Sequence, residues 1–346
     1  MRSSLSELLD VNAVLIADGA TGTNYMDMGL APGDPPELWN ADHPERVTSL
    51  YQRFVDAGAD IVLTNTFGAN ASRLALHHAQ ARVRELNQAS AALARQVADA
   101  ADRPVVVAGS VGPTGALFEP LGPMTHAEAV AIFTEQIEGL RDGGADVAWI
   151  ETMSAAEEMV AAAEASIAAG LPYTVTGSFD TAGRTMMGIH PADFSAVFGA
   201  LPVPPPVATG ANCGVGAADI LVTVAHMDTD RWSVISKGNC GIPHVRGSEV
   251  VYSGSPDLME RYGRLAVHAG VRIVGGCCGT TPEHLAAIRR GVDAGLAEVA
   301  AGGRRPPDVS TIVGELGALS NQAPSASTAG SASHGAPRRR SGRRRD

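Results

Sequence analysis

Ala57-Gly58-Ala59-Asp60-Ile61-Val62 is a junction in which a glycine ends one apolar pattern and a buried, β-branched run begins at once. The same arrangement recurs in Gly143-Gly144-Ala145-Asp146-Val147 and in Ala269-Gly270-Val271-Arg272-Ile273-Val274. Glycine is the usual residue just past the end of a helix, because it adopts the left-handed backbone without steric cost. Each junction therefore predicts a helix that runs directly into a strand, as in parallel βαβ units.

Short apolar runs and longer helical patterns alternate from residue 14 to about residue 297. The strand candidates are residues 14–17, 60–65, 105–110, 146–152, 173–178, 207–212, 233–237 and 272–275. Helical patterns lie between them, at residues 45–57, 82–100, 126–142, 155–168, 219–226, 256–269 and 282–294. Eight such units predict an α/β fold, a (β/α)8 TIM barrel that forms a single domain. A doubly wound open sheet is the alternative, because strands are easily miscounted from one sequence.

The length and composition allow one large domain. The chain has 346 residues, of which 45% are hydrophobic and 18% charged. We expect a lead-in over residues 1–13, the barrel over 14–319 and a tail over 320–346. No apolar run approaches the roughly 20 residues that cross a bilayer, and the first residues lack the apolar segment of a secretory signal. The sequence therefore predicts a soluble, cytoplasmic protein with no membrane partner.

The charge of −11 is unevenly distributed. The tail carries six arginines, at residues 338–340 and 343–345, and is otherwise rich in Ser, Ala, Gly and Pro. Without apolar periodicity it is predicted to be disordered. A basic run can bind nucleic acid or an anionic membrane. The acidic body argues against nucleic acid as a partner, so we expect the tail to be solvated and dispensable.

Three cysteines carry the strongest chemical signal. Two are adjacent in Gly275-Gly276-Cys277-Cys278-Gly279-Thr280-Thr281-Pro282, and the third lies in Gly210-Ala211-Asn212-Cys213-Gly214-Val215-Gly216. Adjacent cysteines bridge each other only with strain, and cysteines of a cytosolic enzyme are more often metal-binding or catalytic. Three thiolates can hold one zinc ion and leave its fourth position open, which is typical of catalytic zinc. A substrate thiol could bind there and become a nucleophile.

The predicted barrel places the polar candidates on one rim. Catalytic residues of this fold lie at the C-terminal ends of the strands. Each of the first four predicted strands ends at or beside a polar residue, and the cysteines follow the sixth and eighth. The candidates are Asp18, Asn65, Ser110, Glu151, Cys213, Cys277 and Cys278. This agreement between fold and chemistry supports the site more strongly than any single motif.

The same segments resemble the homocysteine S-methyltransferase family, in order, from about residue 14 to residue 297. The family includes betaine-homocysteine methyltransferase and the homocysteine-binding module of cobalamin-dependent methionine synthase. The cysteine signature is highly specific, whereas the glycine loops alone are a weak signal. The matching segments are Asp18-Gly19-Ala20-Thr21-Gly22-Thr23, Thr64-Asn65-Thr66-Phe67-Gly68-Ala69-Asn70, Gly109-Ser110-Val111-Gly112-Pro113, Glu151-Thr152, Gly210-Ala211-Asn212-Cys213 and Gly275-Gly276-Cys277-Cys278-Gly279.

The resemblance implies a zinc-dependent barrel in which Cys213, Cys277 and Cys278 are the zinc ligands. It further suggests that Asp18 and Glu151 hold the ammonium group of homocysteine, directly or through water. Asn65 and Ser110 are expected to line the substrate site at the same rim. Asp18 could instead fix the turn that follows it through its own side chain. The expected activity is methyl transfer to the zinc-bound thiolate of homocysteine, giving methionine.

Cys240 leaves the metal site open to a second interpretation. It lies in Ser236-Lys237-Gly238-Asn239-Cys240-Gly241-Ile242-Pro243, after the seventh predicted strand and so on the same rim. As a fourth ligand it would close the site and make the zinc structural. Related proteins commonly have no thiol here, so we expect Cys240 to be a small, partly buried residue beside the site.

The methyl donor is predicted less sharply than the acceptor. A thiolate nucleophile needs an activated methyl group, and the chain shows no cobalamin, folate or adenosyl-donor module, which favours a small onium compound. Glycine betaine is the first candidate, a sulfonium such as S-methylmethionine the second, and a methyl group delivered by a partner the third. Tyr25, Trp39, Phe67 and Phe179 are rim aromatics that could contact such a cation. The sequence departs from the animal betaine enzymes at Gly68 and Thr152, where aromatic residues are expected.

Two other classes of function compete with methyl transfer. One is a non-catalytic, redox-sensing zinc barrel, in which Cys277 and Cys278 oxidise and release the metal. The other is an interaction protein that acts through the arginine tail. A homo-oligomer is compatible with either class and with the enzyme.

Overall fold

The computed structural model describes residues 3–180, 182–199, 204–241, 243–246 and 249–320. Its centre is a sheet of eight parallel strands in the order β1-β10-β7-β6-β5-β4-β3-β2. A parallel bridge between Ala17 and Ile61 joins the two end strands and closes the barrel. The strands are β1 (Leu15–Ile16), β2 (Ile61–Leu63), β3 (Val106–Val111), β4 (Val147–Met153), β5 (Tyr173–Gly177), β6 (Ala208–Cys213), β7 (Val234–Gly238) and β10 (Ile273–Gly276).

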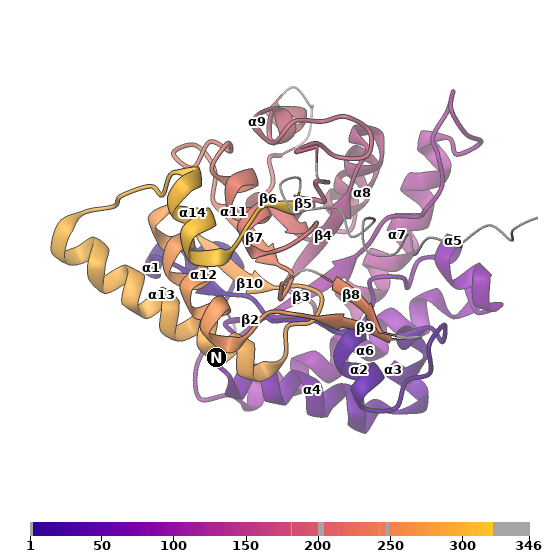
Figure 1. The fold of residues 1–346 in the computed structure, drawn as a ribbon. Helices are drawn as coiled ribbons and strands as arrows, with labels where there is room; N and C mark the ends of the chain where they lie inside the picture. Colours follow the sequence, from indigo (N-terminus) through magenta and orange to yellow (C-terminus); the bar gives the residue numbers. More distant parts are fainter. Residues whose placement is uncertain (1–2, 181, 200–203, 242, 247–248, 321–346) are drawn as a thin grey trace, which may run out of the picture.

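Helices surround the barrel, as Figure 1 shows. The (β/α)8 prediction is confirmed, and the open sheet is not observed. The helices at the predicted positions are α4 (Pro44–Asp56), α6 (Val83–Ala100), α7 (His126–Asp142), α8 (Ala156–Ala168), α11 (Ala217–Val224), α12 (Pro256–His268) and α13 (Pro282–Gly302). The other helices are α1 (Leu5–Val11), α2 (Gly22–Asp27), η1 (Pro36–Leu38), α3 (Trp39–Asp42), α5 (Ala71–Leu74), η2 (Ala75–His77), η3 (Gln80–Arg82), α9 (Pro191–Phe194), α10 (Ala196–Gly199) and α14 (Val309–Leu316).

The glycine junctions have the backbone that the sequence predicts. Gly58, Gly144 and Gly270 follow the ends of α4, α7 and α12 with φ of +101°, +99° and +85°. Only glycine adopts this conformation without strain, so each helix ends there and a strand begins within three residues. At these three junctions the glycine therefore determines where the helix ends and the next strand can begin.

The interior of the barrel changes from apolar to polar along its axis. At the N-terminal end of the strands, α1 contributes Leu5, Leu8 and Leu9 to the same buried cluster as inward residues such as Ile235 and Ile273. A capping box at Ser4 starts this helix, which lies within the stretch predicted only as a lead-in. At the opposite end the inward side chains are polar and charged, and this is where the site lies.

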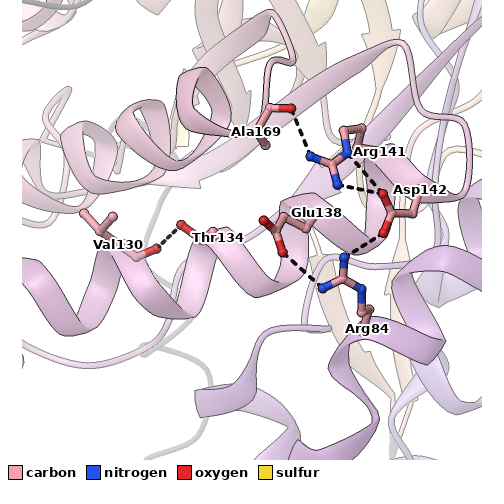
Figure 2. Close-up of polar contacts among 7 residues, drawn as sticks. All are labelled: Arg84, Val130, Thr134, Glu138, Arg141, Asp142 and Ala169. Atoms are coloured by element: carbon pink, nitrogen blue, oxygen red, sulfur yellow. Dashed lines mark hydrogen bonds and ion pairs between the residues drawn. The ribbon is translucent and has the colours of Figure 1, made fainter.

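Polar contacts join neighbouring helices on the outside of the barrel. In Figure 2, Arg84 of α6 reaches Glu138 at 3.0 Å and Asp142 at 2.7 Å, both at the C-terminal part of α7. Arg141 contacts the carbonyl of Ala169 beyond α8. Exposed pairs of this kind contribute little, roughly 0–1 kcal/mol each, so burial against the sheet holds these helices.

Apart from short helices, two features were not predicted. An antiparallel hairpin, β8 (Pro243–Arg246) and β9 (Glu249–Tyr252), is inserted between β7 and α12. Helix α13 extends eight residues beyond the predicted 282–294 pattern. The arginine-rich tail was predicted over residues 320–346, of which residues 321–346 lie outside the described residues. No helix of the described chain is long and apolar enough to span a membrane.

Candidate active site

The three cysteines expected to bind zinc lie together at the C-terminal ends of β6 and β10. Their Sγ atoms are all within 4.8 Å of one another, and those of Cys213 and Cys278 are 4.0 Å apart. Tetrahedral zinc with Zn–S bonds of about 2.3 Å separates its sulfur ligands by about 3.8 Å. The three thiols therefore fit one zinc ion. In the described part of the chain, no histidine or carboxylate joins them as a further ligand.

The backbone and one asparagine hold the two cysteine loops together. Cys213 has a φ of +61° and Gly214 a φ of +68°, so β6 ends in a left-handed turn. Asn239, just after β7, accepts a hydrogen bond from the backbone N–H of Cys278 at 3.0 Å. Its amide group donates to the carbonyl of Gly214, also at 3.0 Å. Asn239 therefore connects the loop of Cys213 to the loop of Cys278.

The clustered thiols favour one thiolate. Hydrogen bonds from Cys213 and Cys277 lower the pKa of Cys278 to about 3, and the Tyr252 hydroxyl of the hairpin acts in the same direction. Contacts with the other two cysteines, followed by burial, raise the pKa of Cys277 well above its usual value. A divalent cation at the centre would take the place of the remaining protons, because a coordinating thiol is deprotonated.

Cys240 lies outside this cluster. Its side chain is buried, and burial raises the pKa of its thiol to about 12. The sulfur packs against Gly254, while its backbone N–H donates to the carbonyl of Cys278 at 2.9 Å. Cys240 therefore contacts the loop of Cys278 through its backbone, and its thiol acts as a packing group.

Replacing Cys240 by alanine should leave the zinc content of the purified protein unchanged. The substitution keeps the backbone hydrogen bond to Cys278 and removes only a buried sulfur that lies outside the trio. Metal analysis of the variant beside the wild type measures this directly. A variant purified without zinc would show that Cys240 is a ligand.

A cavity of about 440 Å³ opens beside the cysteines at the C-terminal end of the barrel. It is lined by most of the residues predicted for the site, namely Asn65, Ser110, Glu151, Cys213, Cys277 and Cys278. Segments from seven parallel strands or the loops that follow them contribute to the lining. The residues expected at the C-terminal rim of the barrel therefore surround one cavity.

Glu151 is a buried carboxylate at the wall of this cavity. The Ser110 hydroxyl donates to its Oε1 at 2.6 Å. Burial raises the pKa of Glu151, and nearby Lys237 opposes that effect. The next residue, Thr152, has a φ of +64°, and the pairing of β4 with β5 is irregular here. The backbone at the end of β4 therefore departs from regular strand geometry. The oxygen not held by Ser110 can accept a hydrogen bond from a ligand.

Asp18, which is expected at the substrate ammonium directly or through water, is bonded to protein groups through both of its carboxylate oxygens. Its Oδ1 accepts from Lys237 Nζ at 2.7 Å, and its Oδ2 accepts from the N–H of Leu63 at 2.7 Å. Both charged side chains are only 2% exposed. Lys237 lines the cavity, whereas Asp18 does not appear in its lining. The sequence analysis missed Lys237, although its position at the end of the seventh strand marked it as a residue of this rim.

Asn65 lines the cavity and also forms hydrogen bonds to neighbouring segments of the chain. Its amide group donates to the carbonyl of Pro36 at 2.7 Å and to the Asn40 side chain at 3.0 Å. Its backbone N–H donates to the Tyr51 hydroxyl at 2.6 Å. These contacts fix the loop after β2 against α4 and the segment that precedes it.

Known proteins resemble this chain along most of its length. The family model described as Homocysteine S-methyltransferase matches residues 15–292. Methionine synthases of Mycobacterium leprae and Mycobacterium tuberculosis are each 32% identical over 309 residues, which is 83% of this chain and 25% of theirs. The chain thus spans about a quarter of the length of these relatives.

Solved structures agree with the sequence comparison. The homocysteine methyltransferase MmuM from Escherichia coli, in its oxidised form, matches with a TM-score of 0.66 and 26% identity over 82% of this chain and 97% of that one. Its metallated form gives a TM-score of 0.67 at 25% identity, over 82% and 98% of the two chains. The chain therefore belongs to the homocysteine S-methyltransferase family.

Proposed function

We propose that this protein transfers a methyl group from a small onium donor to the thiol of homocysteine, giving methionine, with zinc held by Cys213, Cys277 and Cys278. The observation that carries the proposal is that this trio and the buried Glu151 face one cavity. A metal that binds thiols and a carboxylate that binds ammonium groups match the two ends of homocysteine. Bound zinc would deprotonate the substrate thiol and so supply a nucleophile at neutral pH.

The protein's own side chains would orient the acceptor. We assign the substrate ammonium to Glu151, whose geometry is fixed by the Ser110 hydroxyl. Asp18, the second acid expected at the ammonium, would act through Lys237, because it is already bonded to that lysine. With Asp18 and Lys237 paired, Glu151 supplies the negative charge that complements one ammonium group.

The transfer balances without an oxidant or reductant. The thiol loses its proton, and its sulfur forms a bond to the donor's methyl carbon as the donor's C–N or C–S bond breaks. The electron pair of that bond leaves with a neutral amine or thioether. Alignment of the two reactants in one cavity can contribute roughly 7–11 kcal/mol in well-oriented cases. Glycine betaine remains the first candidate donor and a sulfonium the second.

Methionine formation by zinc-loaded protein tests the proposal. Homocysteine is offered with glycine betaine, dimethylsulfoniopropionate and S-methylmethionine in parallel, and methionine is quantified. Turnover with one donor supports the reaction and identifies the substrate. If zinc is bound and no donor reacts, the onium proposal fails, and the similarity to part of two methionine synthases would favour a methyl group supplied by a partner.

Glu151→Gln should raise the KM for homocysteine about 10–100-fold, because a hydrogen bond to a charged group contributes roughly 1.5–3 kcal/mol. The glutamine keeps the shape of the side chain and a contact with Ser110, so zinc content should equal that of the wild type. Steady-state kinetics with homocysteine as the varied substrate, together with metal analysis, measure both quantities. An unchanged KM would remove Glu151 from the ammonium site.

A further inference from the structure

A third buried carboxylate, Glu37, lines the cavity that holds the cysteines and Glu151. It belongs to the short helix η1 and is 5% exposed. It also lines a neighbouring cavity of about 260 Å³, which shares Pro36 and Phe67 with the first. Glu37 and Phe67 therefore form part of the wall between the two spaces. The sequence analysis did not single out Glu37.

Glu37 has a neutral hydrogen-bond donor but no close countercharge. Its Oε1 accepts from the backbone N–H of Gly68 at 2.7 Å. A Cβ at residue 68 would lie 2.8 Å from that oxygen, so any larger residue than glycine would clash with the carboxylate in this position. Among the described residues, no cation lies within ion-pairing distance of Glu37; Arg73 and His77 act on it from farther away and are exposed. A buried carboxylate without a charged partner is costly, which calls for a cation supplied from elsewhere.

Phe67 adds an aromatic surface beside this carboxylate. Its ring packs so closely on Gly112 that a Cβ there would come within 2.7 Å of the ring. The side chain is nevertheless 37% exposed and lines both cavities. Aromatic faces attract quaternary ammonium and sulfonium groups, and a carboxylate attracts the same groups at longer range.

We propose that Glu37, together with Phe67, binds the positively charged head of the methyl donor. The inference rests on the proposed methyl transfer and deepens it by assigning donor recognition to residues distinct from those assigned to homocysteine. The ligand class is a compact onium ion, either a quaternary ammonium or a sulfonium. The cavity holds the acceptor groups and this donor group within one space, as a direct transfer between two small molecules requires.

The competing interpretation is that Glu37 only holds the loop after β2 through Gly68. The chain offers a matched control for that role in Glu158, which is also 5% exposed. Glu158 accepts from the backbone N–H and the hydroxyl of Thr114, at 2.8 and 2.6 Å. It does not line the cysteine cavity. Replacement of either glutamate by glutamine removes a buried charge while keeping an oxygen for the loop.

Pairs of ligands that differ only in the charge of the head group test the proposal. Glycine betaine is compared with its neutral isostere 3,3-dimethylbutyrate, and dimethylsulfoniopropionate with 4-methylpentanoate. Calorimetry measures their binding to zinc-loaded wild type, Glu37→Gln and Glu158→Gln. We expect the wild type and Glu158→Gln to prefer the cation of at least one pair, and Glu37→Gln to lose about tenfold or more of that preference. Zinc content should be equal in all three proteins.

The assignment would be overturned by a wild type that binds neither cation, by a wild type that does not distinguish the cation from its isostere, or by a Glu37→Gln variant that retains the wild-type preference. An equal loss in Glu158→Gln would do the same, because it would trace the effect to loop support. Homocysteine is left out, so no turnover contributes to the signal. If the protein selects the cation but forms no methionine, the role of Glu37 stands and the proposed reaction is refuted. If it forms methionine but does not select the cation, the reaction stands and the role of Glu37 is refuted.

Discussion

Replacing Cys278 by alanine should remove the bound zinc and reduce methyl transfer below about 1% of the wild-type rate, because metal affinity depends on the full set of deprotonated ligands. Cys278 is the member of the trio whose thiolate is most favoured, with its pKa lowered to about 3 by the other two thiols. Two remaining cysteines cannot supply the three-ligand set of a catalytic zinc site. Metal analysis and an assay of methionine formation measure the two losses.

Cys240→Ala is the matched control for this experiment, since it deletes a thiol on the same rim outside the trio. Circular dichroism should show both variants folded, because Cys278 lies outside the buried apolar clusters and Cys240→Ala removes only one sulfur from one of them. If Cys278→Ala keeps its zinc while Cys240→Ala loses it, the ligand assignment is reversed. If both keep their zinc and their activity, the trio is not the metal site.

The barrel could be predicted because its signals are local. Several helix-to-strand junctions contain a glycine whose left-handed backbone ends the helix, as at Gly58 and Gly144. The strands are short apolar runs, and the observed bounds lie within two residues of those predicted. Once the strands are known, the fold itself brings their C-terminal ends together, and so the cysteine trio could be expected. The role of zinc at that trio rests on the family resemblance and the fit of the sulfurs.

Contacts between distant parts of the chain could not be predicted in the same way. Lys237 and Asp18 are separated by 219 residues and meet only because β1 and β7 both flank β10 in the closed barrel. Glu37 lies in a short helix of a loop, where apolar periodicity gives no sign of burial. The side-chain contacts of both residues depend on the path of the loops, which the pattern of strands and helices does not determine. The assignment of Asp18 to the ammonium came from motif resemblance and stays a prediction.

Lys237→Met should lower the free energy of unfolding by about 3–5 kcal/mol, the usual effect of removing one partner from a buried ion pair. Both charged groups are 2% exposed, and the lysine also lies 5.8 Å from the centre of the Trp149 ring. Burial lowers the pKa of Lys237, but Asp18 and Glu151 outweigh that effect and keep it raised. Without the lysine, Asp18 would be left buried with only the Leu63 N–H to stabilise it. Urea unfolding of the zinc-loaded proteins measures the difference.

The double variant Asp18→Asn/Lys237→Met separates the ion pair from the packing of the lysine. It removes both charges, so it should be more stable than Lys237→Met alone, and a double-mutant cycle gives the coupling between the two residues. Additive losses would mean that the pair contributes no coupling energy and that the lysine acts through its contacts with Trp149 and the cavity. A strong coupling would fit a site in which Lys237 neutralises Asp18 and leaves Glu151 as the carboxylate for the substrate. In that case Lys237→Met should also change the KM for homocysteine, because a second unpaired carboxylate would then lie behind the ammonium site.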